Sequence, residues 1–251
     1  DHHITGKVSA AKYDWYFLDD KRCATKIVFD YLLKEFKAPL NDYKEWVDTV
    51  NAVDIWLENE KENFEFGKVL MSMVTKAREI NSILFNSLDR DFKFYLLKNS
   101  IGFLSLKDAP IVLDNSVHSL KKEFLKDGFD DTLDNLSASY LVKSLDKIKD
   151  DLTVYYNGQK GLMTYCLGAI SIPANSFLRA NSDYDFFIDV GRKGNASFRA
   201  DGKLDVSQLA SKLGNGGGHV NASGCKFDDF IETINLQEVR AYIQNKLNNL
   251  K

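Results

Sequence analysis

The change of pattern near residue 150 constrains the fold more than any other feature of this 251-residue chain. From about residue 61 to 150, apolar residues recur at helical spacing among lysines and glutamates, and no proline interrupts the chain between Pro39 and Pro110. After residue 150, short β-branched and aromatic runs alternate with glycine-containing turns. The sequence therefore predicts a mostly helical first part followed by a compact α/β region.

The same patterns predict the individual elements. Helical periodicity covers residues 21–36 and 41–56, with Asn41 as the expected N-cap of the second helix. Pro173 suits the first turn of a helix, and Gly214 suits the end of another. In the α/β region we expect strands at 152–157, 161–170, 184–191 and 195–200, and helices at 173–181, 205–214 and 236–249.

Charge and composition exclude several classes of function. No apolar run approaches the roughly 20 residues of a membrane span, and the N-terminus does not resemble a signal peptide. The net charge of −3 argues against bulk electrostatic binding of long nucleic acid. Residues 152–227 nevertheless carry a charge of +3, so a small anion could be held there. The three scattered cysteines are typical of reduced thiols in a cytoplasmic protein.

The stretch GNGGGHVNASG, residues 214–224, is the first candidate binding motif. Consecutive glycines (Gly216, Gly217 and Gly218) can turn several N–H groups toward one anion, and His219 could donate a hydrogen bond to a phosphate oxygen. A helix beginning at Val220–Asn221 would add its N-terminal N–H groups. The alternative is a flexible loop between a helix and a strand.

Arg199 lies at the end of an expected strand before this stretch, and its guanidinium could bind phosphate with paired donors. The alternative is an edge-strand arginine in solvent. We therefore regard a phosphate site formed by Arg199 and the glycine stretch as a hypothesis.

The opening residues Asp1, His2 and His3 form a second candidate motif. Carboxylate and imidazole together suit divalent metals such as Mn²⁺ or Zn²⁺, although histidines at a chain terminus are also typical of a purification tag. Asp54 ends an apolar stretch, where a carboxylate is costly unless it is paired or binds a metal. Its rival Asp48 would point about 120° away on the same helix, and either could lie on a solvated helix face.

These motifs together resemble the DHH/DHHA1 phosphoesterase family, which includes RecJ-type exonucleases, nano-RNases and cyclic-dinucleotide phosphodiesterases. Residues 1–3 match the motif that names the family, and the helix CATKIVFDYLL follows as it does there. Asp54 in VDIW resembles the family's next aspartate, Arg199 in SFRA its strand arginine, and GGGHVNASG its C-terminal motif. The motifs span almost the whole chain, and the NAVDIW form resembles the nano-RNase branch.

The resemblance implies a two-domain α/β fold. It consists of a partial DHH domain with a helical extension over residues 1–125, a helical connector over 126–150, and a smaller α/β DHHA1 domain over 151–251. The DHH domain should be mostly helical here, because the family's two upstream motifs and first parallel strands would precede residue 1. We therefore expect a piece of a longer protein with an incomplete metal site and weak or no activity.

The resemblance also implies roles for the motif residues. His2 and Asp54 would be metal ligands, and Asp1 would be a ligand or would orient an imidazole. His3 would contact the scissile phosphate, so Asp1 and His3 are the candidate catalytic residues. Arg199, Gly216, Gly217, Gly218 and His219 would grip a substrate phosphate. The expected cofactor of the intact protein is a pair of Mn²⁺ ions.

The expected function is that of a cytoplasmic Mn²⁺-dependent phosphodiesterase acting on short single-stranded RNA or dinucleotides, with no membrane partner. Cleavage of cyclic dinucleotides or of a 3′-phosphoadenosine nucleotide is a close variant. A non-catalytic nucleotide- or RNA-binding module is the alternative from another class, and an unrelated helical domain with an α/β tail is a third. The oligomeric state stays open, with a homodimer as one option. His118 has no assignable role and is expected on a helix face.

Overall fold

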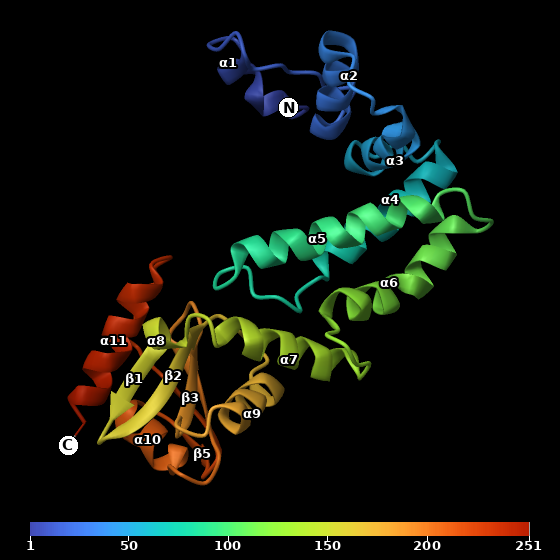
Figure 1. Cartoon of the computed structure of the whole chain (residues 1–251). Coiled ribbons are helices and arrows are strands. Elements are labelled where there is room, and N and C mark those ends of the chain that lie inside the picture. The colour runs from blue at the N-terminus through green and yellow to red at the C-terminus, as the bar shows by residue number, and fades with distance from the viewer. Residues whose placement is uncertain (251) are drawn as a thin grey trace. The chain divides into compact units, whose positions relative to one another are not determined.

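The computed structural model describes residues 1–250 and divides the chain into two compact units (Figure 1). The first unit comprises residues 1–78 and 92–124, and the second comprises residues 79–91 and the chain from residue 125 onward. The expected change from a helical part to an α/β part is confirmed.

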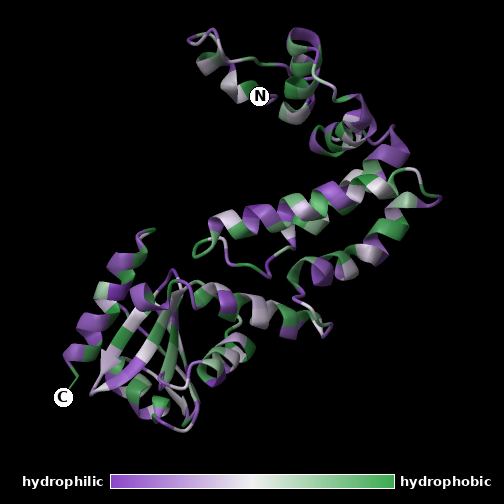
Figure 2. Cartoon of the chain, viewed as in Figure 1, coloured by the Kyte–Doolittle hydropathy of each residue, from purple (hydrophilic) through white to green (hydrophobic). Residues whose placement is uncertain are grey.

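The first unit is built from helices whose hydrophobic and hydrophilic residues alternate along their length (Figure 2). Its core includes Phe66, Leu70, Phe92 and Leu113, all at most 3% exposed. The α-helices that lie wholly or partly in this unit are α1 (Lys7–Ala10), α2 (Ala24–Phe36), α3 (Lys44–Asp54), α4 (Lys61–Thr75), α5 (Asn86–Ser100) and α6 (Ala109–Leu125). Short 3₁₀ turns lie at Ile4–Gly6, Asn41–Tyr43 and Ile101–Phe103.

The expected N-cap at Asn41 is wrong. Asn41 begins a 3₁₀ turn, and α3 follows this turn directly with Tyr43 at the N-cap position. No side chain caps the helix, and a carbonyl of the preceding turn accepts instead: the N–H of Lys44, the first residue of α3, donates to the Asn41 carbonyl. His118 lies exposed on α6, as expected.

The second unit contains, within residues 1–250, one six-stranded sheet in the order β1-β2-β3-β4-β6-β5. Strands β2 and β3 pair in parallel, and the other neighbours are antiparallel. All five residues of β3 are buried, which places it at the centre of the core. The strands are β1 (Thr153–Tyr156), β2 (Gln159–Tyr165), β3 (Phe186–Val190), β4 (Asn195–Ala200), β5 (Gly217–His219) and β6 (Ala222–Lys226).

Helices cover both faces of this sheet, with α9 and α11 on opposite sides (Figure 1). The Phe177 ring of α9 lies 5.9 Å from the Phe187 ring of β3, which defines the α9 face. Pro173 lies in the first turn of α9 and Gly214 is the C-cap of α10, as expected. The helices are α7 (Leu133–Leu145), α8 (Lys149–Leu152), α9 (Ser171–Ala180), α10 (Val206–Leu213) and α11 (Leu236–Asn248).

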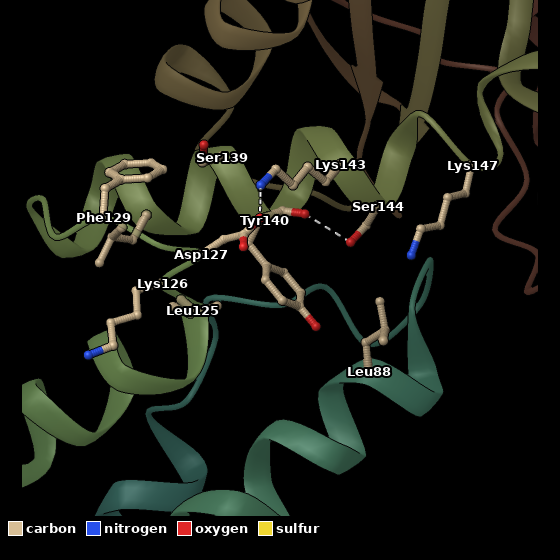
Figure 3. Close-up of a pocket in the computed structure, with 11 residues that line it drawn as sticks. Leu88, Leu125, Lys126, Asp127, Phe129, Ser139, Tyr140, Lys143, Ser144 and Lys147 are labelled. Carbon is tan, nitrogen blue, oxygen red and sulfur yellow. Dashed lines mark hydrogen bonds and ion pairs between the residues drawn. The ribbon is translucent and has the colours of Figure 1, made fainter.

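A cavity of about 260 Å³ lies in the second unit beside α7 (Figure 3). Leu88, Leu136 and Tyr140 line it, and the Lys143 ammonium pairs with the Asp127 carboxylate at its rim. None of the residues singled out from the sequence lines this cavity. None of the helices within residues 1–250 has the length and apolar character needed to cross a bilayer.

Candidate active site

The Asp1 carboxylate organises the opening tripeptide. Its Oδ1 accepts hydrogen bonds from the backbone nitrogens of His2 and His3, at 2.8 and 3.2 Å, and lies 2.8 Å from His3 Nδ1. One ligand atom from each of these three residues lies within 4.8 Å of the others. The motif therefore brings a carboxylate and two imidazoles together within reach of one metal ion.

Tyr16 holds the other oxygen of this carboxylate, and the sequence analysis did not find it. The Tyr16 hydroxyl donates a 2.5 Å hydrogen bond to Asp1 Oδ2. Gly6 makes this contact possible, because a Cβ there would lie 2.5 Å from the Tyr16 hydroxyl oxygen. The aromatic run YDWY gives no sequence signal for this role, since the hydrogen bond depends on the chain folding back onto residue 1.

His2 has an unsatisfied nitrogen that points to a metal. Its side chain is 18% exposed, and Nδ1 is buried without a hydrogen-bond partner within residues 1–250. Asp54 Oδ2 lies 3.8 Å away, too far for a hydrogen bond. A buried polar atom without a partner is costly, and an ion bound by imidazole and carboxylate would satisfy both groups. The residues present therefore fit a divalent metal.

The structure separates the two aspartates that the sequence left as rivals. Asp48 forms ion pairs with Lys26 and Lys44, at 3.0 and 2.9 Å, whereas Asp54 faces His2. Burial acts to raise the pKa of the Asp48 carboxyl, but the hydrogen bonds from Lys44 and Lys26 outweigh it and lower that pKa. Asp48 thus has the contacts of a structural ion pair.

Helix packing fixes the position of Asp54, the last residue of α3. The Cys23 N–H donates to Asn51 Oδ1 at 2.8 Å and so joins the start of α2 to α3. Gly67 of α4 lets α3 approach closely, because a Cβ at Gly67 would lie 2.7 Å from Val53 Cβ. The carboxylate is therefore carried on a helix held from two sides.

In the second unit, strand register places Arg199 and His219 in one row. Arg199 of β4 and His219 of β5 both pair with Ala222 of the intervening β6. Residues directly opposite in a sheet project from the same face, so Arg199 and His219 flank a small alanine at a distance of roughly two strand spacings, about 10 Å. This is the α9 face, because Arg199 also pairs with Phe187.

The three consecutive glycines have different reasons to be glycine. A Cβ at Gly216 would lie 2.4 Å from Cys225 Cβ, and Gly218 has a φ of +144° and would clash with the Ala222 carbonyl. A Cβ at Gly217 would meet only Ser211 Oγ, at 3.9 Å. Packing within the protein therefore explains Gly216 and Gly218, whereas the space beside Gly217 is open.

The helix considered at Val220–Asn221 is not present. The chain turns there and returns as β6, so the stretch forms a hairpin of β5 and β6. The Val206 N–H donates to the Val220 carbonyl, and the Gly202 N–H donates to Asn221 Oδ1. These long-range bonds fix the turn, so no helix N-terminus contributes to an anion site here.

Arg199 is oriented without a counter-ion. Its guanidinium donates to the Ser171 hydroxyl at 2.9 Å and to the Phe198 carbonyl at 2.7 Å, and no carboxylate pairs with it among the residues described. His219 is exposed. A half-buried arginine held by neutral acceptors keeps its charge available for an anion.

A buried carboxylate supports this arrangement, and the sequence analysis missed it as well. Asp189 of β3 accepts hydrogen bonds from the backbone nitrogens of Leu167 and Gly168 and from the Thr164 hydroxyl, at 2.8 to 3.1 Å. Burial raises the pKa of the Asp189 carboxyl, although these donors oppose the rise. The bonds hold the loop that leads into Ser171 and α9.

Comparison with known proteins agrees with this geometry. Residues 168–249 match the DHHA1 domain. A 3′,5′-cyclic-nucleotide phosphodiesterase of Helicobacter pylori is 42% identical over 99% of this chain and 73% of its own length. The oligoribonuclease NrnB of Bacillus subtilis is 24% identical over the whole chain and 59% of its own length.

A solved structure agrees over nearly the whole chain. A crystal structure of an uncharacterized protein from Helicobacter pylori superimposes with a TM-score of 0.92 at 44% identity, covering 99% of this chain and 74% of that one. Both the order of the motifs and these matches lead to one assignment. The chain belongs to the DHH/DHHA1 family of phosphoesterases.

Proposed function

We propose that the protein is a Mn²⁺-dependent phosphodiesterase that hydrolyses short oligoribonucleotides or dinucleotides. The observation that carries the proposal is the buried His2 Nδ1, which has no hydrogen-bond partner and faces the Asp54 carboxylate at 3.8 Å. This arrangement leaves a nitrogen and a carboxylate oxygen free for a cation beside Asp1 and His3. The names of the two curated relatives support phosphodiester chemistry.

In this proposal the first unit supplies the chemistry. His2, Asp54 and Asp1 would hold divalent metal, which supplies an activated water and charge relief at the phosphoryl oxygens when bound. The Tyr16 hydroxyl keeps Asp1 oriented through Oδ2, and Asp1 in turn holds His3 through Oδ1. His3 is 67% exposed, and in this proposal it would donate a hydrogen bond to the scissile phosphate.

The second unit supplies a separate phosphate grip. Arg199 offers paired donors on one side of Ala222, His219 offers a donor on the other, and Gly217 leaves the strand backbone accessible. A 5′-phosphorylated dinucleotide carries a second phosphate, which a grip of this kind could recognise.

A second candidate follows from the more similar relative, which is named a 3′,5′-cyclic-nucleotide phosphodiesterase. A 3′,5′-cyclic mononucleotide carries a single phosphate, so it would engage the metal ligands without needing a second grip. The two candidates therefore differ in how strongly activity should depend on Arg199.

The test uses the full-length natural protein with Mn²⁺. We would compare 5′-labelled RNAs of two to about ten nucleotides, linear and cyclic dinucleotides, and 3′,5′-cyclic AMP, with His2→Ala and Arg199→Ala alongside. We expect rapid cleavage of the shortest linear substrates, loss of activity in His2→Ala, and a KM raised roughly 10- to 100-fold in Arg199→Ala.

Two outcomes would contradict the proposal. Turnover of cyclic AMP alone, unaffected by Arg199→Ala, would assign the second candidate. Tight binding of nucleotides without turnover of any substrate, despite bound metal, would indicate a non-catalytic binding module.

A further inference from the structure

Two aromatic side chains stand in solvent on the segment that follows the DHH motif. Trp15 is 78% exposed and Tyr13 is 49% exposed. Their rings are stacked on each other, with centroids 5.4 Å apart and planes inclined by 28°. Covering two adjacent rings of this size would remove a large apolar area from water, so the pair could serve as a binding surface.

Hydrogen bonds tie this segment to the candidate metal ligand. Tyr16, the residue after Trp15, donates its hydroxyl to Asp1 Oδ2 at 2.5 Å. The Asp19 N–H donates to the Asp1 carbonyl at 3.0 Å. The Trp15 ring also contacts the Tyr16 ring, with centroids 5.9 Å apart. The side chain of Tyr16 therefore holds the stacked pair close to Asp1.

We propose that Tyr13 and Trp15 form a stacking platform for a nucleobase of the substrate, an inference that rests on the phosphodiesterase function proposed above. A nucleobase has a flat π-face and stacks on aromatic side chains without base-specific hydrogen bonds. The planes of the Tyr13 and Trp15 rings are close enough to parallel for a nucleobase to add a third ring to the stack. The Asp1 hydrogen bond links the platform to the residue that would help to hold the metal.

The platform makes a specific prediction about substrate choice. Stacking tolerates any base. Adenine and guanine substrates should nevertheless bind somewhat better than cytosine and uracil, because their ring systems are larger. A substrate that lacks bases should gain nothing from the platform. Base dependence of KM, with kcat unchanged, is therefore the signature of this surface.

The experiment compares Trp15→Ala, Trp15→Phe and Tyr13→Ala in the full-length protein, with Phe94→Ala as the control. Phe94 is 60% exposed in the same unit and belongs to α5. Each variant is assayed on a 5′-phosphorylated diadenylate and on the matching abasic dinucleotide. We expect Trp15→Ala to raise KM about tenfold on the diadenylate only. We expect Trp15→Phe to restore most of the loss and Phe94→Ala to change nothing.

An equal loss on both dinucleotides would overturn the inference, because it would show that the rings support the fold or the metal ligands. An unchanged KM in Trp15→Ala would overturn it as well. If the protein hydrolyses no substrate, the proposed function fails, but the platform is still tested by binding. In that case quenching of tryptophan fluorescence by AMP, absent in Trp15→Phe, supports it, and no quenching refutes it.

Discussion

His2 and His219 lie in the two motifs that support this family assignment, but the two imidazoles have different surroundings. His2 is 18% exposed and belongs to a cluster in which side chains bond to side chains, with Tyr16 on Asp1 and Asp1 on His3. His219 is exposed and lies on β5, which is held by backbone pairing with β6.

The difference indicates how each site can fail. The proposed metal ligands depend on a chain of polar side chains, so one substitution removes an orienting bond. The proposed phosphate grip depends on strand register and on small residues, so we expect an added methyl group to be the damaging change. Substitutions that delete atoms should affect the first site, and substitutions that add atoms should affect the second.

The largest effect is expected for His2→Ala, which removes a proposed metal ligand from the cluster of Asp1, His2 and His3. Loss of an orienting partner usually costs about 10- to 100-fold in metal affinity or activity, and loss of a ligand should cost more. We therefore expect Tyr16→Phe to lower kcat/KM about tenfold and His2→Ala to abolish measurable turnover. Mn²⁺ titration calorimetry and kcat/KM of the full-length protein check this. Normal Mn²⁺ affinity in His2→Ala would remove His2 from the ligand set.

Adding one methyl group at Gly217 tests the proposed phosphate grip on β5. The nearest atom to a Cβ there is Ser211 Oγ at 3.9 Å, so we expect Gly217→Ala to fold normally. The methyl group should instead hinder a bound phosphate and raise KM by roughly tenfold, equivalent to losing one good hydrogen bond.

Gly216→Ala is the matched contrast at the neighbouring position. Its Cβ would lie 2.4 Å from Cys225 Cβ, so we expect a loss of about 1–3 kcal/mol of stability from overpacking. Thermal unfolding and KM are measured for both variants. If Gly217→Ala keeps a wild-type KM, the open space beside Gly217 is not a phosphate site.

The sequence predicted local elements well and the site only in part. The turn residues around Gly158 and the strands on either side of it were readable because a hairpin is a local structure. The hairpin of β5 and β6 was not predicted, since glycine is disfavoured in strands and β6 also pairs with β4, more than twenty residues earlier. Long-range register therefore decided the structure of the glycine stretch.

The same limit applies to the candidate site residues. Asp1, His2 and His3 were visible as a motif, but the hydroxyl that orients Asp1 comes from Tyr16, and no spacing rule connects them. Periodicity placed Asp48 and Asp54 on different sides of one helix, yet only the neighbouring Lys26 and His2 show which one is neutralised and which faces an imidazole. Sequence supplied the candidates, and tertiary contacts distinguished them.

A smaller effect is expected at Gly67, where α4 packs against α3, the helix that carries Asp54. A Cβ at Gly67 would lie 2.7 Å from Val53 Cβ and 2.8 Å from the Thr49 carbonyl oxygen. Alanine favours a helix over glycine by about 1 kcal/mol, but overpacking typically costs 1–3 kcal/mol, so we expect a net loss of about 1 kcal/mol. Separation of α3 from α4 should also move Asp54 and weaken Mn²⁺ binding.

Gly102→Ala provides the control for that substitution. Nothing lies within 4 Å of a Cβ at Gly102, so we expect no loss of stability and no change in Mn²⁺ affinity. Urea unfolding and Mn²⁺ titration are the measurements. Equal effects of the two substitutions would show that close approach of α3 and α4 does not support Asp54.

The smallest effect is expected for Asp48→Asn, and it sharpens the distinction between the two aspartates of α3. Asp48 bonds to Lys26 and Lys44 and is a quarter exposed, so the free energy of unfolding should fall by only about 1 kcal/mol or less. Activity should stay at the wild-type level, whereas Asp54→Asn should lose activity with little change in stability.

The pH dependence of this stability difference follows from the lowered pKa of Asp48. A carboxyl with a lowered pKa in the folded state binds fewer protons there than in the unfolded chain, so its contribution is present above the unfolded pKa of about 3.9. The difference in unfolding free energy between the wild type and Asp48→Asn should therefore be constant between about pH 5 and 7 and shrink below about pH 4. Urea unfolding across this range measures it. A difference that persists at the lowest pH would show that packing of the carboxyl group, and not its charge, is what stabilises the junction of α2 and α3.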